Sequence, residues 1–256
     1  MINKENENIT RDTFYKGKVI VYQHKKGYRF SVDAPVLADF LPFEPGQKAL
    51  EIGTGSGIVS LLALYKNKFS YIYSIEIQEK LSRLAEINGK ENGFSKKYKV
   101  INDDFNKVFN SDEFTGIRHI FSNPPFLSTN LGRLSPNREI RDAKFETTLR
   151  LQELLTKSYT LLNPKTPGAA AEKESRGSLY LILPHSRFAE MERLAGQTGF
   201  FIHRLRLIFS FKIGKPERFL VQLTNQDVSP VDLKPLIIFK EVGKYTEEME
   251  NIFSGR

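Results

Sequence analysis

The amino-acid sequence predicts an α/β fold in which helices cover a mostly parallel sheet. From residue 48 onward, short apolar runs of strand length alternate with segments whose apolar residues recur at helical spacing, as is typical of such sheets. A glycine-rich turn, Gly53-Thr54-Gly55-Ser56-Gly57, joins the first apolar run to the first helical segment. The chain has 256 residues, of which 40% are hydrophobic, so it can bury the core of one α/β domain with additions, or of at most two small domains.

The expected elements follow from local patterns. Apolar runs predict strands at residues 48–52, 71–76, 98–102, 119–122 and 178–183. Apolar spacing predicts helices at residues 56–65, 145–162 and 187–197, and a further helix with Leu81, Leu84, Ala85 and Asn88 on one face that ends at Asn92-Gly93. In the last third, apolar runs at residues 201–211 and 218–223 flank a turn-like segment. They predict an antiparallel hairpin that closes the edge of the sheet.

Residues 1–47 are expected to form a small extension, a hairpin and a helix, that packs on the main domain at residues 48–256. Residues 14–22 alternate like a strand, and residues 33–40 have a helical pattern with Asp33 placed as its cap. Two later segments, 127–144 and 163–177, show little apolar periodicity. We expect the first to be a lid beside the site and the second an insertion without a role in it.

Composition limits the kinds of site that the chain can hold. It has no cysteine, which excludes disulfides and thiolate chemistry. Its four histidines are isolated, so no metal site is expected. No apolar run approaches the roughly 18 to 20 residues of a membrane span, and the polar start lacks the apolar stretch of a signal peptide. We therefore expect a cytoplasmic protein without a membrane partner.

The formal net charge of +8 favours a polyanionic partner. Lysine and arginine are concentrated at residues 11–29 and 204–218, where each stretch has a single acidic residue. Lysine at the edge of a sheet also prevents edge-to-edge association. The charge pattern alone therefore leaves a binding role and a purely structural role open.

The glycine turn predicts a binding site for a cofactor. Gly53, Gly55 and Gly57 have no side chains, so they permit positive φ and close approach of a ligand to the backbone. Their Gly-x-Gly-x-Gly spacing differs from the Gly-x-Gly-x-x-Gly of dinucleotide sites. Glycine turns between a strand and a helix also occur for packing alone, so the turn needs support from its neighbours.

Acidic residues at the strand ends provide that support. Glu51 is placed to meet an amino group, and Glu76 ends the second strand, where a carboxylate can accept hydrogen bonds from both hydroxyls of a ribose. Asp103 and Asp104 follow the third strand, and Asp104 is the favoured acceptor for an adenine amine. These features indicate an adenosine-containing ligand, and S-adenosylmethionine fits the glycine spacing better than NAD does.

The segment Asn123-Pro124-Pro125-Phe126 follows the fourth strand and predicts a site for a planar amine. The side-chain oxygen of Asn123 and the carbonyl of Pro124 can each accept one hydrogen of an NH₂ group, which directs the nitrogen toward a methyl donor. Pro124 and Pro125 stiffen the loop, and Phe126 can stack on a base. The plain alternative is that two prolines merely end a strand.

With these motifs, the chain resembles the class I methyltransferases that act on exocyclic amines, and among them a small bacterial group that methylates adenine in the anticodon loop of a valine tRNA. The resemblance extends over nearly the whole chain. It is carried by residues 27–33, 51–57, 76, 104, 123–126 and 143–146.

The resemblance implies a Rossmann-like class I methyltransferase fold, with a seven-stranded mostly parallel sheet whose last strand is antiparallel. Phe30 and Asp33 are then expected to lie over the cofactor, and Thr54, Ile77 and Phe105 complete the set of cofactor-binding residues. The implied reaction uses S-adenosylmethionine, yields S-adenosylhomocysteine and methylates an adenine amine in RNA, with a tRNA expected.

Other acceptors are known for the same motif, namely adenines of ribosomal RNA or DNA and glutamine amides of proteins. Glutamine enzymes typically have a larger N-terminal helical domain and a tyrosine after the prolines, whereas only 47 residues precede the first predicted strand here and the aromatic residue is Phe126. DNA enzymes usually add a target-recognition domain, which the sequence lacks. A non-catalytic RNA-binding module is the alternative from another class. A monomer is the favoured state.

Overall fold

The computed structural model describes residues 9–26, 29–124, 149–163 and 177–256. The expected lid at 127–144, nearly all of the insertion at 163–177, and Pro125 and Phe126 lie outside these residues. The resemblance segment 143–146 and the first two residues of the segment 27–33 also lie outside them.

The described residues form a main sheet of nine strands with the order β10-β8-β9-β7-β6-β3-β4-β5, and β11 also pairs with β8. The strands are β3 (Glu44–Ile52), β4 (Phe69–Ile75), β5 (Tyr98–Ile101), β6 (His119–Ser122), β7 (Ser178–Pro184), β8 (Phe201–Phe209), β9 (Arg218–Thr224), β10 (Val231–Asp232) and β11 (Leu236–Ile237). Strands β3 to β7 run parallel to one another, whereas β9 is antiparallel to both β7 and β8.

This topology confirms the predicted α/β fold and the C-terminal hairpin. Seven of the strands are the expected ones. The two additional strands, β10 and β11, are two residues long and pair in parallel with β8, so β8 is not the edge that the sequence predicted. Two-residue strands carry too little apolar periodicity to be recognised from the sequence.

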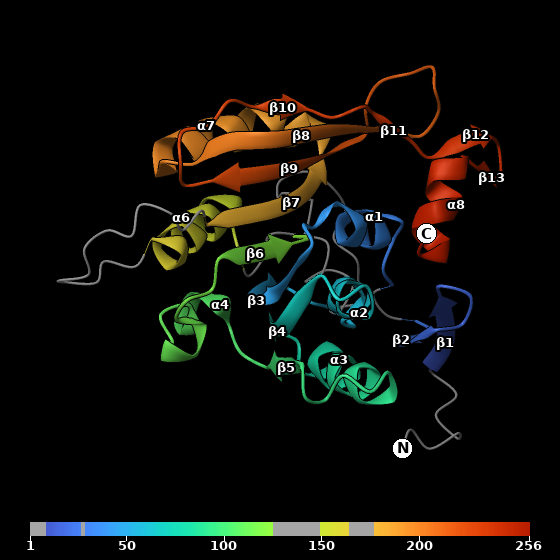
Figure 1. Ribbon diagram of the computed structural model, residues 1–256, viewed down its shortest axis with the longest axis horizontal. Helices are drawn as coiled ribbons and strands as arrows, with labels where there is room; N and C mark the ends of the chain where they lie inside the picture. The colour runs from blue at the N-terminus through green and yellow to red at the C-terminus, as the bar shows by residue number, and fades with distance from the viewer. Residues whose placement is uncertain (1–8, 27–28, 125–148, 164–176) are drawn as a thin grey trace.

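Helices cover the sheet on both faces (Figure 1). They are α1 (Asp33–Phe40), α2 (Ile58–Tyr65), α3 (Glu79–Glu91), α4 (Phe105–Val108), α6 (Leu151–Leu162), α7 (Phe188–Thr198) and α8 (Glu247–Ser254). Neighbouring strand residues point to opposite faces. Ala49 therefore packs in a core cluster with α1, α2 and α8, whereas Leu50 packs in a second cluster with α6 and α7.

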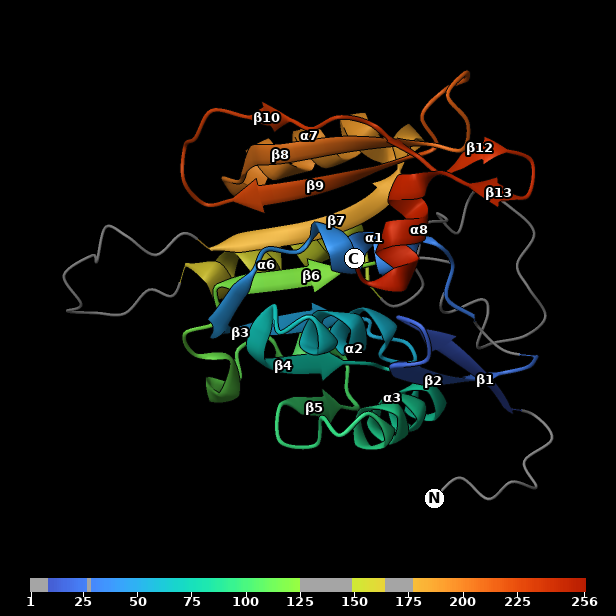
Figure 2. The ribbon, with the colours of Figure 1, turned by 45° about the vertical axis from the view of Figure 1, so that its right-hand side comes forward.

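The N-terminal extension is a hairpin of β1 (Ile9–Phe14) and β2 (Val19–His24) followed by α1. The hairpin lies beside α3, as Figure 2 shows. The single strand predicted for residues 14–22 is wrong, because a turn at Tyr15 and Lys16, both with positive φ, divides it. Tyr15, Val19 and Val21 are all buried, so the apolar alternation continues across the turn and conceals it.

The C-terminal end adds a small hairpin of β12 (Phe239–Glu241) and β13 (Lys244–Tyr245) before α8. Its rings continue into the helix, since Phe239 stacks on Tyr245 at a centroid distance of 5.0 Å and Tyr245 contacts Phe253 edge-on at 4.8 Å. Among the described helices, none is long and apolar enough to cross a membrane.

Candidate active site

The register of the parallel strands brings the predicted site residues to one edge of the sheet. Ile52 of β3 pairs with Ser122 of β6 on one side and with Ile75 of β4 on the other. Each of these residues ends its strand, so Gly53, Asn123 and Glu76 begin three neighbouring loops. Ligands of open α/β sheets bind at this carboxyl edge. The structure therefore brings the glycine turn and Asn123, the first residue of the other predicted part, to the same edge of the sheet.

The glycine turn has the backbone conformation that its composition predicts. Gly53, Gly55 and Gly57 have φ values of +72°, +58° and +89°, which residues with side chains rarely adopt. A Cβ added at Gly57 would lie 2.8 Å from the hydroxyl oxygen of Tyr98, whereas a Cβ added at Gly53 would meet no atom within 4 Å. Packing therefore explains Gly57, and Gly53 borders open space that a ligand can fill.

Glu76 holds the turn from the neighbouring strand end. Its Oε2 accepts a hydrogen bond from the backbone N–H of Gly55 at 2.8 Å, and its Oε1 accepts one from the N–H of Gln78 at 2.9 Å. The Glu76 side chain is buried. The carboxylate is thus fixed in direct contact with the turn.

Glu51 lies beneath the turn and is 2% exposed. Its Oε2 accepts hydrogen bonds from the hydroxyls of Thr54 at 2.5 Å, Ser74 at 3.3 Å and Ser60. Among the described hydrogen bonds, none reaches Oε1. Burial raises the pKa of Glu51 to about 7, although the three hydroxyl donors act against this rise. A cationic amino group at Oε1 would stabilise the charged form.

The acidic residues after β5 are placed at the start of the next helix. Asp104 Oδ1 accepts a hydrogen bond from the backbone N–H of Asn106 at 2.9 Å and so caps α4, while Asp103 Oδ1 accepts from the N–H of Asp104 at 2.7 Å. Phe105 is buried in the core, whereas Ile77 is exposed. Both aspartates remain at the same edge as Glu76, because Ile101 pairs with Ile75.

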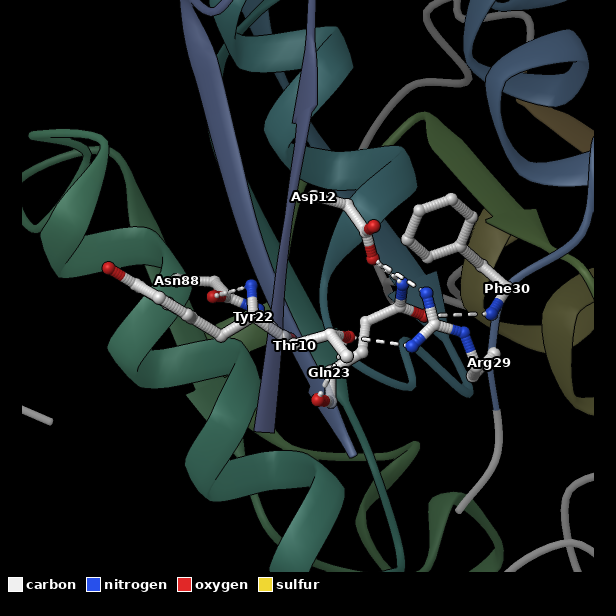
Figure 3. Close-up of polar contacts among 7 residues, drawn as sticks. All are labelled: Thr10, Asp12, Tyr22, Gln23, Arg29, Phe30 and Asn88. Atoms are coloured by element: carbon white, nitrogen blue, oxygen red, sulfur yellow. Dashed lines mark hydrogen bonds and ion pairs between the residues drawn. The ribbon is translucent and has the colours of Figure 1, made fainter. Parts of the chain in front are cut away.

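Phe30 and Asp33 are fixed by residues far away in the sequence. The N–H of Phe30 donates a hydrogen bond of 3.0 Å to Gln23 Oε1, as Figure 3 shows, and its ring lies 5.4 Å from that of Phe14. Asp33 is the first residue of α1, not its cap as predicted. Its carboxylate instead forms an ion pair of 2.8 Å with Arg218 of β9 and accepts a hydrogen bond from the Ser31 hydroxyl.

Asn123 presents an unsatisfied acceptor at the end of β6. Its Oδ1 is buried and has no hydrogen-bond partner among the described residues. The preceding residue, Ser122, is anchored by a hydrogen bond of 2.7 Å from its hydroxyl to the carbonyl of Ile52. A buried acceptor without a donor costs free energy, so this oxygen is suited to a ligand that supplies an N–H group.

Asn88 of α3 and Asn92, the residue that follows this helix, have contacts that the sequence did not reveal. The side chain of Asn88 bonds both backbone polar groups of Tyr22, and that of Asn92 bonds both backbone polar groups of Ile20. The apolar spacing placed Asn88 on the inward face of the helix. A carboxamide on a buried face needs hydrogen-bond partners. The inward position of Asn88 was therefore the one sequence signal that it bonds another segment.

Several arginines of the two basic stretches contact other residues of the same chain. Arg29 pairs with Asp12 at 2.9 Å, Arg206 pairs with Glu248, and Arg218 pairs with Asp33. The guanidinium of Arg204 lies 4.5 Å from the centre of the Phe40 ring. Exposed lysines at positions 16, 18, 25, 212 and 215 remain on the surface. In the described part of the chain, no group of three or more metal-ligating side chains comes together.

Comparisons with known proteins agree with this geometry. The family model described as methyltransferase small domain matches residues 27–140. Two relatives carry the name tRNA1(Val) (adenine(37)-N6)-methyltransferase. The one from Flavobacteriaceae bacterium (strain 3519-10) is 23% identical over 231 residues, covering 90% of this chain and 92% of its own. The one from Shewanella sp. (strain MR-7) is 26% identical over 224 residues, covering 87% and 89%.

Solved structures share the fold. A predicted O-methyltransferase from Agrobacterium tumefaciens superposes with a TM-score of 0.63 at 17% identity, covering 87% of this chain and 96% of its own. TrmK from M. capricolum, solved in complex with the cofactor product S-adenosyl-homocysteine, superposes with a TM-score of 0.51 at 13% identity, covering 80% and 72%. Residues 27–140 therefore match the methyltransferase small domain model, and the chain has the α/β fold of these solved structures.

Proposed function

We propose that this protein transfers a methyl group from S-adenosylmethionine to the N6 amine of an adenine in a tRNA. The observation that carries the proposal is the buried Oδ1 of Asn123, which has no donor among the described residues and lies at the strand end next to the glycine turn. The names of the relatives support the same acceptor.

On the acceptor side, the chain supplies position and not a strong base. Asn123 Oδ1 accepts one hydrogen of the adenine amine, and the Pro124 carbonyl accepts the other. The nitrogen is then held for in-line attack, in which the N–CH₃ bond forms as the S–CH₃ bond breaks. The amine proton becomes acidic only as the methyl group arrives, so it can leave to water.

On the donor side, the cofactor supplies an electrophilic methyl group on a sulfonium. Gly53 and Gly55 give the backbone room to approach it, and Thr54 fixes Glu51 beneath the turn. Glu51 Oε1 would pair with the cationic amino group of the cofactor, Glu76 would accept hydrogen bonds from its ribose hydroxyls, and Asp104 would accept one from its adenine amine. Asp103, Ile77 and Phe105 line the adenine side, and Phe30 and Asp33 cover the site from the N-terminal extension.

The RNA is held through its phosphates and through the target base. The exposed lysines at residues 16, 18, 25, 212 and 215 are suited to phosphate contacts, and Phe126 stacks on the flipped adenine. Residues 1–47 act as an extension of the catalytic domain at 48–256, and the protein acts as a monomer.

The test is incubation of the purified protein with isotope-labelled S-adenosylmethionine and total RNA from the cell, followed by mass spectrometry of the nucleosides. The proposal predicts label in N6-methyladenosine of the tRNA fraction and none with Asn123→Ala. Label in protein would identify a glutamine acceptor, and label in ribosomal RNA would identify the alternative RNA. Absence of label from all fractions, together with absent cofactor binding in calorimetry, contradicts an enzyme.

A further inference from the structure

The side chain of Asn88 connects the glycine turn to the N-terminal hairpin. Its Nδ2 donates hydrogen bonds to the carbonyl oxygens of Ser56 at 2.8 Å and of Tyr22 at 3.0 Å. Its Oδ1 accepts a hydrogen bond from the N–H of Tyr22 at 2.8 Å (Figure 3). Asn88 is 0% exposed. A single buried amide therefore fixes both the Ser56 carbonyl, inside the turn, and the outer edge of β2.

Glu76 and Asn88 hold the turn at adjacent residues. Glu76 accepts from the N–H of Gly55, and Asn88 donates to the carbonyl of Ser56. Between them they fix the direction of the Thr54–Gly55 and Ser56–Gly57 peptide groups. Hydrogen bonds that set a backbone before a ligand arrives lower the ordering cost of binding.

The hairpin also fixes the position of Arg29 and Phe30, in the segment proposed to cover the site. Gln23, next to Tyr22 in β2, accepts from the N–H of Phe30 through Oε1 and donates to Asp12 through Nε2 at 2.5 Å. Arg29 donates to the same Asp12 oxygen at 2.9 Å and to the Thr10 hydroxyl at 2.6 Å. Figure 3 shows these contacts converging from β1, β2 and the start of the following segment.

We infer that Asn88 is a positioning residue for the cofactor: it holds the glycine turn in a fixed position relative to the hairpin, whose Gln23 in turn binds the backbone of Phe30. The inference rests on the proposed function, since it assumes that the turn binds S-adenosylmethionine. Asn88 is fully buried and cannot itself contact RNA, so the loss expected from its replacement is in cofactor binding.

Asn92 offers a matched control one helical turn later. Its Oδ1 accepts from the N–H of Ile20 at 2.8 Å, and its Nδ2 donates to the carbonyl of Ile20 at 2.7 Å. Its Nδ2 also donates a hydrogen bond of 2.7 Å to the carbonyl of Asn88, in the last turn of α3, and not to the glycine turn. The two asparagines therefore differ in the bond to Ser56 and in burial, since Asn88 is fully buried and Asn92 is partly exposed.

The experiment compares Asn88→Asp with Asn92→Asp. Each change keeps the side-chain shape, removes two donor bonds and adds a negative charge near the end of α3. Asn88→Asp should lower the thermal unfolding temperature more, because Asn88 is fully buried and Asn92 is partly exposed. The dissociation constant of S-adenosylmethionine is measured by calorimetry, and kcat and KM are measured with tRNA. Asn88→Ala and Asn92→Ala make the same comparison without the charge if an aspartate variant fails to fold.

We expect Asn88→Asp to raise the dissociation constant and the KM for S-adenosylmethionine about tenfold, the effect of one lost hydrogen bond. Its kcat at saturating cofactor and its tRNA affinity should stay within about twofold of wild type, and Asn92→Asp should bind the cofactor within the same margin. Equal cofactor affinity of the two variants, or a fall in kcat alone, overturns the inference. Absence of cofactor binding by the wild type overturns the proposed function itself.

Discussion

Arg218, the first residue of β9, forms an ion pair with Asp33, the first residue of α1, with Nε and Oδ1 2.8 Å apart. The Asp33 side chain is 2% exposed and the Arg218 side chain 29% exposed. The pair joins the C-terminal hairpin to the segment that is proposed to cover the cofactor.

Replacement of Arg218 by alanine should therefore destabilise the protein strongly. It leaves the buried Asp33 carboxylate without its cation, and breaking such a pair costs about 3 to 5 kcal/mol. Arg83→Ala is the control, since Arg83 and Glu79 are both exposed and their pair contributes less than about 1 kcal/mol. Urea unfolding measures both. Similar free energies of unfolding for the two variants would show that Asp33 does not depend on Arg218.

Asn123→Ala should abolish activity without destabilising the fold. The side-chain oxygen has no hydrogen-bond partner among the described residues, so its removal leaves no described donor unpaired. We expect kcat to fall about 100-fold or more through loss of positioning. Single-turnover kinetics, calorimetry with S-adenosylmethionine and thermal unfolding check this. A large loss of cofactor affinity would contradict the assignment of Asn123 to the acceptor.

The raised pKa of Glu51 predicts a pH dependence of stability. The folded-state pKa, about 7, lies above the ordinary value of 4.5. The folded protein therefore binds more protons than the unfolded chain between these values, and this contribution to stability is lost as pH rises from about 4.5 through about 7. The wild type should lose up to about 1.4 kcal/mol per pH unit relative to Glu51→Gln, which cannot titrate. A pH-independent difference in urea unfolding would refute this.

The ionised form of Glu51 should also bind the cofactor better. A carboxylate attracts a cationic amino group, and a neutral carboxyl group does not. The affinity for S-adenosylmethionine should therefore rise between pH 6 and 8, up to about tenfold per pH unit below the pKa. The Glu51→Gln variant should lack this rise. Calorimetry over the same pH range measures it, and parallel pH profiles would remove Glu51 from the amino-group site.

Two glycines of the turn should respond differently to alanine. Gly57→Ala combines a positive φ with a close approach to the Tyr98 hydroxyl, so it should lower stability by more than the roughly 1 to 2 kcal/mol of a left-handed alanine. Gly53→Ala has only the backbone cost, but its methyl group enters open space where the cofactor is proposed to bind. It should weaken cofactor binding more than its loss of stability explains, as parallel unfolding and calorimetry will show.

Affinity for tRNA should fall steeply with salt if the exposed lysines contact phosphates. Four such contacts would weaken binding about 100-fold between 50 and 200 mM salt. Filter binding across this range gives the slope, and replacement of Lys212 and Lys215 by alanine should reduce it. A flat response would exclude these basic residues from the RNA-binding surface.

The core strands, the glycine turn and the C-terminal hairpin were predictable because their signals are local. The apolar run before Gly53 and the one before Asn123 each mark a strand end, and the parallel topology then brings both ends to one edge. The strand boundaries differ by a few residues, as with β3, which begins at Glu44. Local composition was thus enough to identify both halves of the candidate site.

The remaining features depend on contacts between distant segments. The turn at Tyr15 and Lys16 uses residues with side chains at positive φ, and buried Tyr15 preserves the alternation. The bonds of Asn88 and Asn92 to β2 join segments that no local pattern connects. For the same reason, the sequence overestimated how much of the basic stretch at 204–218 is available to bind RNA. Its arginines have acidic and aromatic partners elsewhere in the fold.

The hydrogen bonds that the side chains of Asn88 and Asn92 form with β2 also affect the association of this protein with other copies of itself. A strand with unpaired backbone groups on its outer edge recruits strands of other molecules and promotes aggregation. At Ile20 and Tyr22, those groups are already bonded to Asn92 and Asn88. The outer edge of β2 is therefore closed to intermolecular strand pairing without a covering strand, and a molecule that lacked both amides would expose it.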